Sequence, residues 1–140
     1  MFLNRFNEAE KRGFLELALL AVRADDAITT EEVQFVEELR LGLGISEEDF
    51  VQHILADPDF AQAVAAFELD ESRRLAFLEL VALMYADGQY DPAESQFLRR
   101  LQAAFAIDEE AARLHHGWAR RLLQLRSEAL TLIRGGLPTP

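Results

Sequence analysis

Apolar positions along this chain recur with the spacing of helices and are broken by polar capping residues. Two stretches, residues 14–22 and 75–86, are apolar nearly all round, which is typical of helices at the centre of a bundle. Segments between them open with acids, Ser or Thr in capping positions, so the pattern predicts about seven helices. No segment combines strict alternation with β-branched enrichment and turn pairs, and the predicted fold class is therefore all-α.

Glycine and proline positions predict where several of these helices begin and end. Gly42 and Gly44 are expected to end the helix that starts near Thr30, and Pro58 to be the first residue of a later helix. The last helix is expected to run from about Asp108 to Arg134, followed by a frayed tail at 135–140. Residues 1–6 are predicted to form a short leading helix or a docking arm.

Length and charge favour one globular domain over residues 1–140. The chain has 50% hydrophobic residues and a net charge of −11, which repels phosphate backbones and excludes nucleic acid as an expected partner. No apolar run approaches the ~20 residues of a membrane span, and no signal-peptide pattern opens the chain, so a cytoplasmic location is expected. The absence of cysteine excludes disulfides and thiolate metal sites.

Two parts of the chain, about 14–50 and 77–112, are similar to each other. At an offset of 62, residues 24–48 and 86–110 share nine identities, among them Asp25 with Asp87 and Glu32 with Glu94. Each copy reads as a buried helix, an acidic turn, a capped amphipathic helix and a further acidic helix start. The pattern predicts an internal two-fold repeat whose halves pack against each other in a single bundle.

The motif at the second turn resembles the TerB-like family of tellurite-resistance proteins. Residues 85–94, read as Tyr-Ala-Asp-Gly-Gln-Tyr-Asp-Pro-Ala-Glu, match the family pattern best, and residues 23–32 depart from it with Asp26 for the usual Gly and Thr29 for the later Asp. The resemblance covers about residues 14–110. It implies a seven-helix bundle, no established catalytic activity and a role in metal-linked or envelope stress responses. Related domains occur in J-domain co-chaperones.

The acidic turns carry the clearest candidate chemistry, a divalent-cation site shared between the two copies. Hard cations such as Ca²⁺ or Mg²⁺ take carboxylate oxygens, so these ions are favoured over Zn²⁺. The competing interpretation is that Asp91, Glu94 and Glu32 act only as helix caps. The candidate ligands are Asp25, Asp26, Glu32, Asp87, Asp91 and Glu94.

Other polar residues receive structural interpretations. Glu16 and Glu79 occupy matching places in the two apolar stretches and are expected on narrow solvent-facing stripes, with Arg12 available to pair with Glu16. His115 and His116 point about 100° apart on a helix, so they cannot chelate one ion and are expected to be surface or partly packed residues. No nucleophile, phosphate-loop or dinucleotide motif is present, and the chain is not expected to be an enzyme.

Charge is distributed unevenly along the chain. Residues 1–112 hold 24 acids and 9 bases, a net charge of −15, whereas residues 113–140 hold five arginines and one acid, a net charge of +4. The expected arrangement is an arginine-rich helix lying across its own acidic bundle; docking to an acidic protein partner or an anionic membrane surface is the alternative. The sequence thus favours a non-enzymatic, cation-binding module of a bacterial stress response. A metal-free protein-interaction adaptor or co-chaperone-like module is the second hypothesis.

Overall fold

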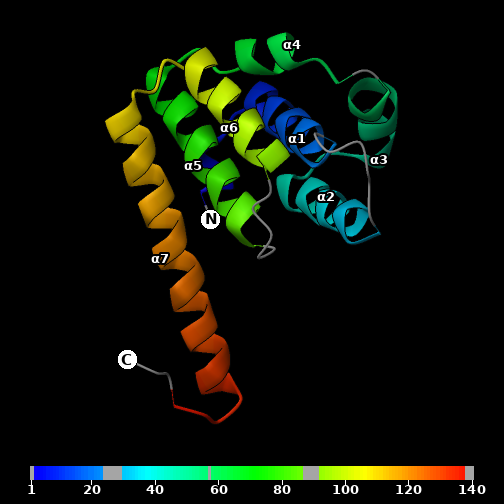
Figure 1. Ribbon diagram of the computed structural model, residues 1–140. Coiled ribbons are helices and arrows are strands. Elements are labelled where there is room, and N and C mark those ends of the chain that lie inside the picture. The colour runs from blue at the N-terminus through cyan, green and yellow to red at the C-terminus, as the bar shows by residue number, and fades with distance from the viewer. Residues whose placement is uncertain (1, 24–29, 57, 87–91, 138–140) are drawn as a thin grey trace.

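A computed structural model describes residues 2–23, 30–56, 58–86 and 92–137, a part of the chain made of helices joined by loops and turns (Figure 1). The fold is all-α, as predicted, and the described residues contain no strand. In chain order the elements are η1 (Leu3–Arg5), α1 (Glu8–Val22), α2 (Thr30–Leu43), α3 (Glu47–Asp49), the π-helical η2 (Phe50–Leu55), α4 (Phe60–Ala65), α5 (Asp70–Ala86), α6 (Pro92–Ala104) and α7 (Glu109–Ile133).

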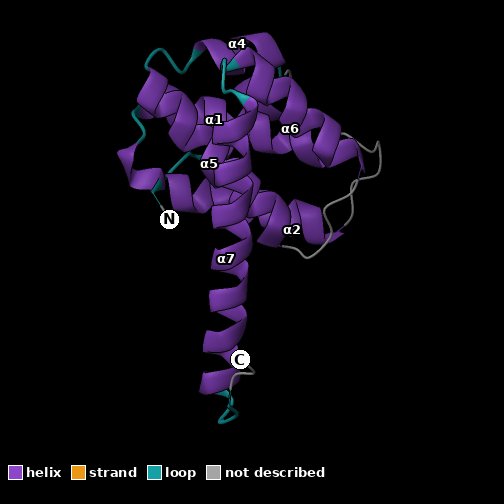
Figure 2. Ribbon diagram, turned by 60° about the vertical axis from the view of Figure 1, so that its left-hand side comes forward, coloured by secondary structure: helices purple, strands orange, loops and turns teal. Residues whose placement is uncertain are grey.

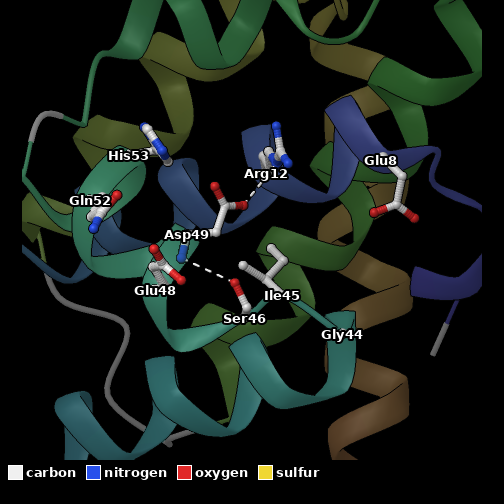
Figure 3. A pocket seen from close by; sticks show the side chains of 9 residues that line it. All are labelled: Glu8, Arg12, Gly44, Ile45, Ser46, Glu48, Asp49, Gln52 and His53. Atoms are coloured by element: carbon white, nitrogen blue, oxygen red, sulfur yellow. Dashed lines mark hydrogen bonds and ion pairs between the residues drawn. The ribbon is translucent and has the colours of Figure 1, made fainter.

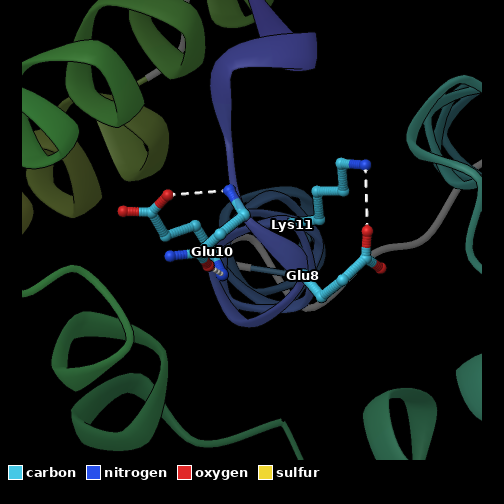
Figure 4. A network of polar contacts seen from close by, with 4 residues as sticks. Glu8, Glu10 and Lys11 are labelled. Carbon is cyan, nitrogen blue, oxygen red and sulfur yellow. Dashed lines mark hydrogen bonds and ion pairs between the residues drawn. The ribbon is translucent and has the colours of Figure 1, made fainter.

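Local capping explains where α1 begins (Figure 4). The Asn7 side chain accepts a hydrogen bond from the Glu10 backbone N–H at 2.8 Å, and the Glu10 carboxylate accepts one from the Asn7 N–H at 2.9 Å. This reciprocal capping box satisfies two N–H groups that the first turn leaves without helical partners. Lys11 Nζ donates to Glu8 Oε1 at 3.2 Å on the opposite side of the same turn. These four polar residues therefore have a structural role.

Two predicted helix boundaries are wrong by one or two residues. Helix α4 begins at Phe60, because the Asp59 carboxylate caps the N–H groups of Ala61 and Gln62, so Pro58 lies outside the helix. Helix α2 continues through Gly42 and ends at Leu43. The first residue after it, Gly44, has a φ of +72°, the left-handed conformation that ends helices.

The ends of α2 and α6 have the same geometry, 62 residues apart. Gly44 and Ala106 both adopt positive φ, +72° and +57°, and each is followed by a buried isoleucine, Ile45 or Ile107. The Ile45 N–H donates to the Arg40 carbonyl at 3.1 Å, and the Ile107 N–H donates to that of Gln102 at 3.0 Å. This local match agrees with the predicted repeat, whereas the two-fold relation between whole halves stays a prediction.

The core lies around α1 and α5, as their apolar sequences predict. In α1, Phe14, Leu15 and Leu17 have no exposed surface, and in α5 the same holds for Phe77 and Leu80. Burying such side chains contributes about 1.5–3 kcal/mol each to the free energy of unfolding. Phe14 also joins three further rings in an aromatic cluster with tilted or edge-on contacts between 5.3 and 5.7 Å, made of Phe6, Phe14, Phe67 and Phe105.

The N-terminal segment is docked on the body, which corrects the expectation for Glu79. The Glu79 carboxylate is only 4% exposed and accepts a hydrogen bond from the Phe2 backbone N–H at 2.8 Å. Phe6 is buried, and the Phe2 ring lies 6.4 Å from the ring of Trp118 on α7. Glu79 therefore fixes the leading segment in place and does not lie on a solvent-facing stripe, whereas its counterpart Glu16 is half-buried.

Helix α7 leaves the body halfway along its length (Figure 1). Its first half packs along α5, with Ala112 and Ala119 buried. The second half projects beyond the other helices in both views (Figure 2). The expectation that the whole arginine-rich helix lies across its own bundle is therefore wrong for this second half. None of the helices in the described ranges is both long and apolar enough to cross a membrane.

Candidate functional site

The predicted cation site falls largely outside the part of the chain that the structure describes. Four of its six residues, Asp25, Asp26, Asp87 and Asp91, are outside the described residues, and so is the side chain of Glu32. Glu94 is described. It lies in the first turn of α6, is half-buried, and has its Oε2 atom shielded from solvent.

The helices that flank the two acidic turns contact one another. Helix α1 leads into the first turn and α5 into the second; α1 contacts α2, α5 and α6. Helices α2 and α6, which follow the turns, begin at Thr30 and Pro92, again 62 residues apart. A carboxylate in the first turn of α6 is favoured by the partial positive charge of the helix N-terminus. The carboxylate of Glu94 thus lies at the N-terminus of α6, where its negative charge is stabilised.

The described residues contain no group of three or more His, Asp or Glu side chains that could hold a metal ion. A second cation site elsewhere in the described ranges therefore has no support. The two adjacent histidines are packed as expected, since the rings of His115 and His116 lie edge-on to Phe77 at 5.3 and 6.2 Å. His116 Nδ1 is also 3.1 Å from the Tyr85 hydroxyl oxygen.

An open polar pocket of about 420 Å³ lies between α1 and the α2–α3 junction (Figure 3). Arg12 and Asp49 in this pocket are already paired with each other, since Arg12 Nε is 3.0 Å from Asp49 Oδ2, and Ser46 Oγ accepts from the Asp49 N–H at 3.1 Å. The structure gives Arg12 a partner 37 positions away, where the sequence suggested Glu16 on its own helix. The lining residues are Glu8, Arg12, Gly44, Ile45, Ser46, Glu48, Asp49, Gln52 and His53.

A second pocket, of about 290 Å³, lies between α6 and α7 and is basic. Arg99, Arg113 and Arg120 line it together with His116. Burial lowers the pKa of His116 below its ordinary value, and the positive charge of Arg120 lowers it further. Arginines at positions 113 and 120 lie two helical turns apart on one face, a spacing that sequence reasoning could have used but did not.

Comparison with known proteins finds one family. Residues 56–116 match the family model described as tellurite resistance protein TerB. No curated protein and no solved structure matches the chain significantly. The matched segment spans α4, α5, α6 and the start of α7, and it includes Glu94 and the second acidic turn. The sequence motif and the family match thus agree, and both make residues 56–116 of this all-helical chain similar to TerB.

Proposed function

We propose that this chain is a non-catalytic, cytoplasmic binding module of a tellurite-resistance-like system, and that it holds a divalent cation through its acidic turns. The observation that carries the proposal is the TerB match over residues 56–116, because the matched segment contains Asp87, Asp91 and Glu94. Two of these three acids, Asp87 and Glu94, recur 62 residues earlier as Asp25 and Glu32. An acidic turn that lies in the family segment and is repeated earlier in the chain supports a shared role for the two copies.

The donor chemistry selects the kind of ion. All six candidate ligands are carboxylates, and the chain has no cysteine. Oxygen donors of this kind suit Ca²⁺ or Mg²⁺, whereas Zn²⁺ sites are built mainly from thiolates and imidazoles. Glu94 fits such a site, since its carboxylate is half-buried and one of its oxygens is shielded from water. When bound, a dication would neutralise carboxylates that otherwise repel one another.

Thermal unfolding tests the proposal directly. We expect the melting temperature in EDTA to be lower than in millimolar Ca²⁺ or Mg²⁺ by several degrees, because a ligand at ~100 times its Kd adds about 2.7 kcal/mol to the free energy of unfolding. The shift should disappear in Asp25→Asn/Asp87→Asn and weaken in Glu94→Gln. Asp108→Asn is the matched control, because Asp108 caps α7 and Asn caps equally well.

An absence of any cation effect would contradict the proposal and favour the second candidate, a metal-free protein-interaction adaptor or co-chaperone-like module. One observation favours that alternative: Leu125, Leu132 and Ile133 on the projecting half of α7 are 58–79% exposed. Exposed apolar side chains gathered on one element are typical of protein-binding surfaces. In that case binding of a protein partner should be the same in EDTA and in Ca²⁺.

A further inference from the structure

The second half of α7 presents apolar side chains that its own chain does not cover. We call residues 122–133 the distal arm. Between Gln124 and Leu137 none of the described residues is buried, and both views show this part of α7 extending past the body (Figures 1 and 2). Leu130, for example, is 49% exposed. Leaving such side chains in water forgoes about 1.5–3 kcal/mol each, which association with another surface would recover.

Five apolar side chains from Trp118 into the distal arm follow a heptad spacing, and Leu123, Leu130 and Ile133 lie outside it. Trp118, Leu122, Leu125, Ala129 and Leu132 are separated by four, three, four and three residues, so they form one seam along the helix. Trp118 and Leu122 are half-buried, whereas Leu125, Ala129 and Leu132 are exposed. The seam therefore begins against the body and continues beyond it as the a and d positions of a coiled coil would.

Charge identifies a second copy of this chain as the occupant. Residues 113–140 carry a net charge of +4 and residues 1–112 a net charge of −15. Three of the five arginines precede the distal arm, whose own charged residues are Arg126 and Glu128. Beside Arg121, a second copy of α7 offers its Glu128, a partner of opposite charge. An anionic membrane is a poorer match, because the distal arm has no net positive charge to attract it.

The residues that flank the seam select the direction of pairing. Arg121 and Glu128 lie on one side of it and Arg126 on the other. In a parallel pair Arg121 would face Arg126 of the second copy, which is repulsive. In an antiparallel pair, Leu122 of each copy packs against Leu125 of the other. Arg121 of each copy then faces Glu128 of the other, so this pair of opposite charges forms twice. Opposite charges at such flanking positions set orientation in helix pairs.

We propose that this chain forms a homodimer through antiparallel pairing of its α7 helices. Leu122 of each copy packs against Leu125 of the other at the centre. The distal arm of each copy then runs along the other copy at the level of Trp118 and of Leu114, which is itself 66% exposed. This dimer goes beyond the proposed cation-binding function and does not depend on it.

Sedimentation equilibrium of the full-length chain measures the association. We expect a species of twice the 15.9 kDa chain mass, with Leu125→Glu raising the dimer dissociation constant by at least ~100-fold. Leu69→Glu is the matched control and should leave the constant unchanged, because Leu69 is 67% exposed and lies outside α7. Circular dichroism at low protein concentration checks that each variant remains folded.

Charge reversal tests the register. Arg121→Glu and Glu128→Arg should each weaken the dimer by roughly tenfold. The double variant exchanges the two charges and should restore wild-type association. A monomer at every concentration, or a double variant as weak as the single variants, would overturn the proposed pairing.

Cysteine cross-linking tests the direction, since the chain has no native cysteine. Antiparallel pairing places the two copies of residue 129 more than about 16 Å apart, beyond disulfide reach. Ala129→Cys should therefore form no disulfide dimer under oxidation, whereas Leu122→Cys mixed with Leu125→Cys should form a mixed dimer. An Ala129→Cys disulfide dimer would show parallel pairing and would overturn the proposal. A monomer that binds anionic phosphatidylserine vesicles through the distal arm would show a lipid partner and would overturn it as well.

Discussion

Ala106 is the one described residue other than glycine with a positive φ, and its counterpart 62 positions earlier is Gly44. A left-handed conformation costs an L-residue with a Cβ atom about 1–2 kcal/mol, whereas glycine adopts it freely. The two helices therefore end with the same geometry, which strains the backbone at Ala106 after α6 and does not strain it at Gly44 after α2. This contrast gives a pair of opposite substitutions.

Ala106→Gly should raise the free energy of unfolding by roughly 0.5–1 kcal/mol, because it removes the backbone strain. Gly44→Ala should lower that free energy by about 1 kcal/mol or more, even though a Cβ at Gly44 meets no atom within 4 Å. Urea denaturation of both variants measures the two changes. The control is Ala103→Gly inside α6, which should cost up to about 1 kcal/mol; equal losses at 103 and 106 would contradict the argument.

Two half-buried histidines make stability depend on pH. Burial lowers the pKa of His115, the charges of His116 and Arg74 lower it further, and the pKa of His116 is lowered for the reasons given above. His115 Nδ1 is buried and has no hydrogen-bond partner among the described residues. Because the unfolded chain binds protons more readily than the folded one, stability is lost as pH falls through about 6.5 toward the lowered values.

We therefore expect the free energy of unfolding of the wild type to fall between pH 7.5 and pH 5 more steeply than that of His115→Gln/His116→Gln. Guanidinium titrations at closely spaced pH values measure this difference in slope. His53→Gln serves as the control, because His53 is exposed and far from Phe77 in sequence. A double variant with the wild-type slope would contradict the assignment.

At the scale of elements, the contact between α1 and α4 depends on Gly13. A Cβ at this position would lie 2.9 Å from the Ala66 Cβ and 3.0 Å from the Ala63 carbonyl oxygen. Helix α1 can therefore approach α4 only because residue 13 has no side chain. Gly42 inside α2 is the opposite case, since a Cβ there meets nothing within 4 Å.

Gly13→Ala should destabilise the fold by about 1–3 kcal/mol despite the better helix propensity of alanine, because the two helices must move apart. Gly42→Ala adds the same methyl group where no other atom is near, and it should raise the free energy of unfolding by about 0.5–1 kcal/mol. Thermal and denaturant unfolding of both variants measures these changes in the free energy of unfolding. Changes of the same sign at the two glycines would contradict the proposed close packing.

Elements were predictable from sequence where local capping and apolar spacing decide them. The starts of α1, α2, α6 and α7 follow from caps and acids that act within one turn. Pro58 shows the limit, because Asp59 also offers a cap and only the fold selects between them. Glu79 could not be assigned from its own helix, since its partner is the backbone of Phe2, 77 positions away.

The candidate site was less predictable than the fold. The acidic turns were found by repetition, and Glu94 lies where a helix start favours it. The basic pocket was missed, because its arginines come from α6 and α7 and meet only when the two helices pack. The spacing of Arg113 and Arg120 marks one face of α7, but nothing in the sequence places Arg99 of α6 opposite that face.

At the scale of the whole molecule, burial and charge both change along α7. All described buried residues lie at or before Ala119, and the positive net charge belongs to residues 113–140. The body should therefore fold without the distal arm, whereas association requires it.

A chain that ends at Leu123 should retain its helical content and melt at a temperature independent of protein concentration. The full-length chain should melt at a temperature that rises with concentration, because association stabilises the folded state by mass action. Differential scanning calorimetry over a hundredfold concentration range compares the two. Loss of cooperative unfolding in the shorter chain would show that the arm supports the body.

The uneven burial of α7 also determines the order in which proteases would degrade the molecule. Helices open locally where little is buried, and an opened backbone is what a protease cuts. A trypsin-like enzyme that cleaves after Arg121 or Arg126 removes the exposed arm and leaves the entire described core intact. Such clipping would be irreversible and would release a folded, strongly acidic single body. A cell could thus separate the two copies of the proposed dimer permanently without unfolding any part of their cores.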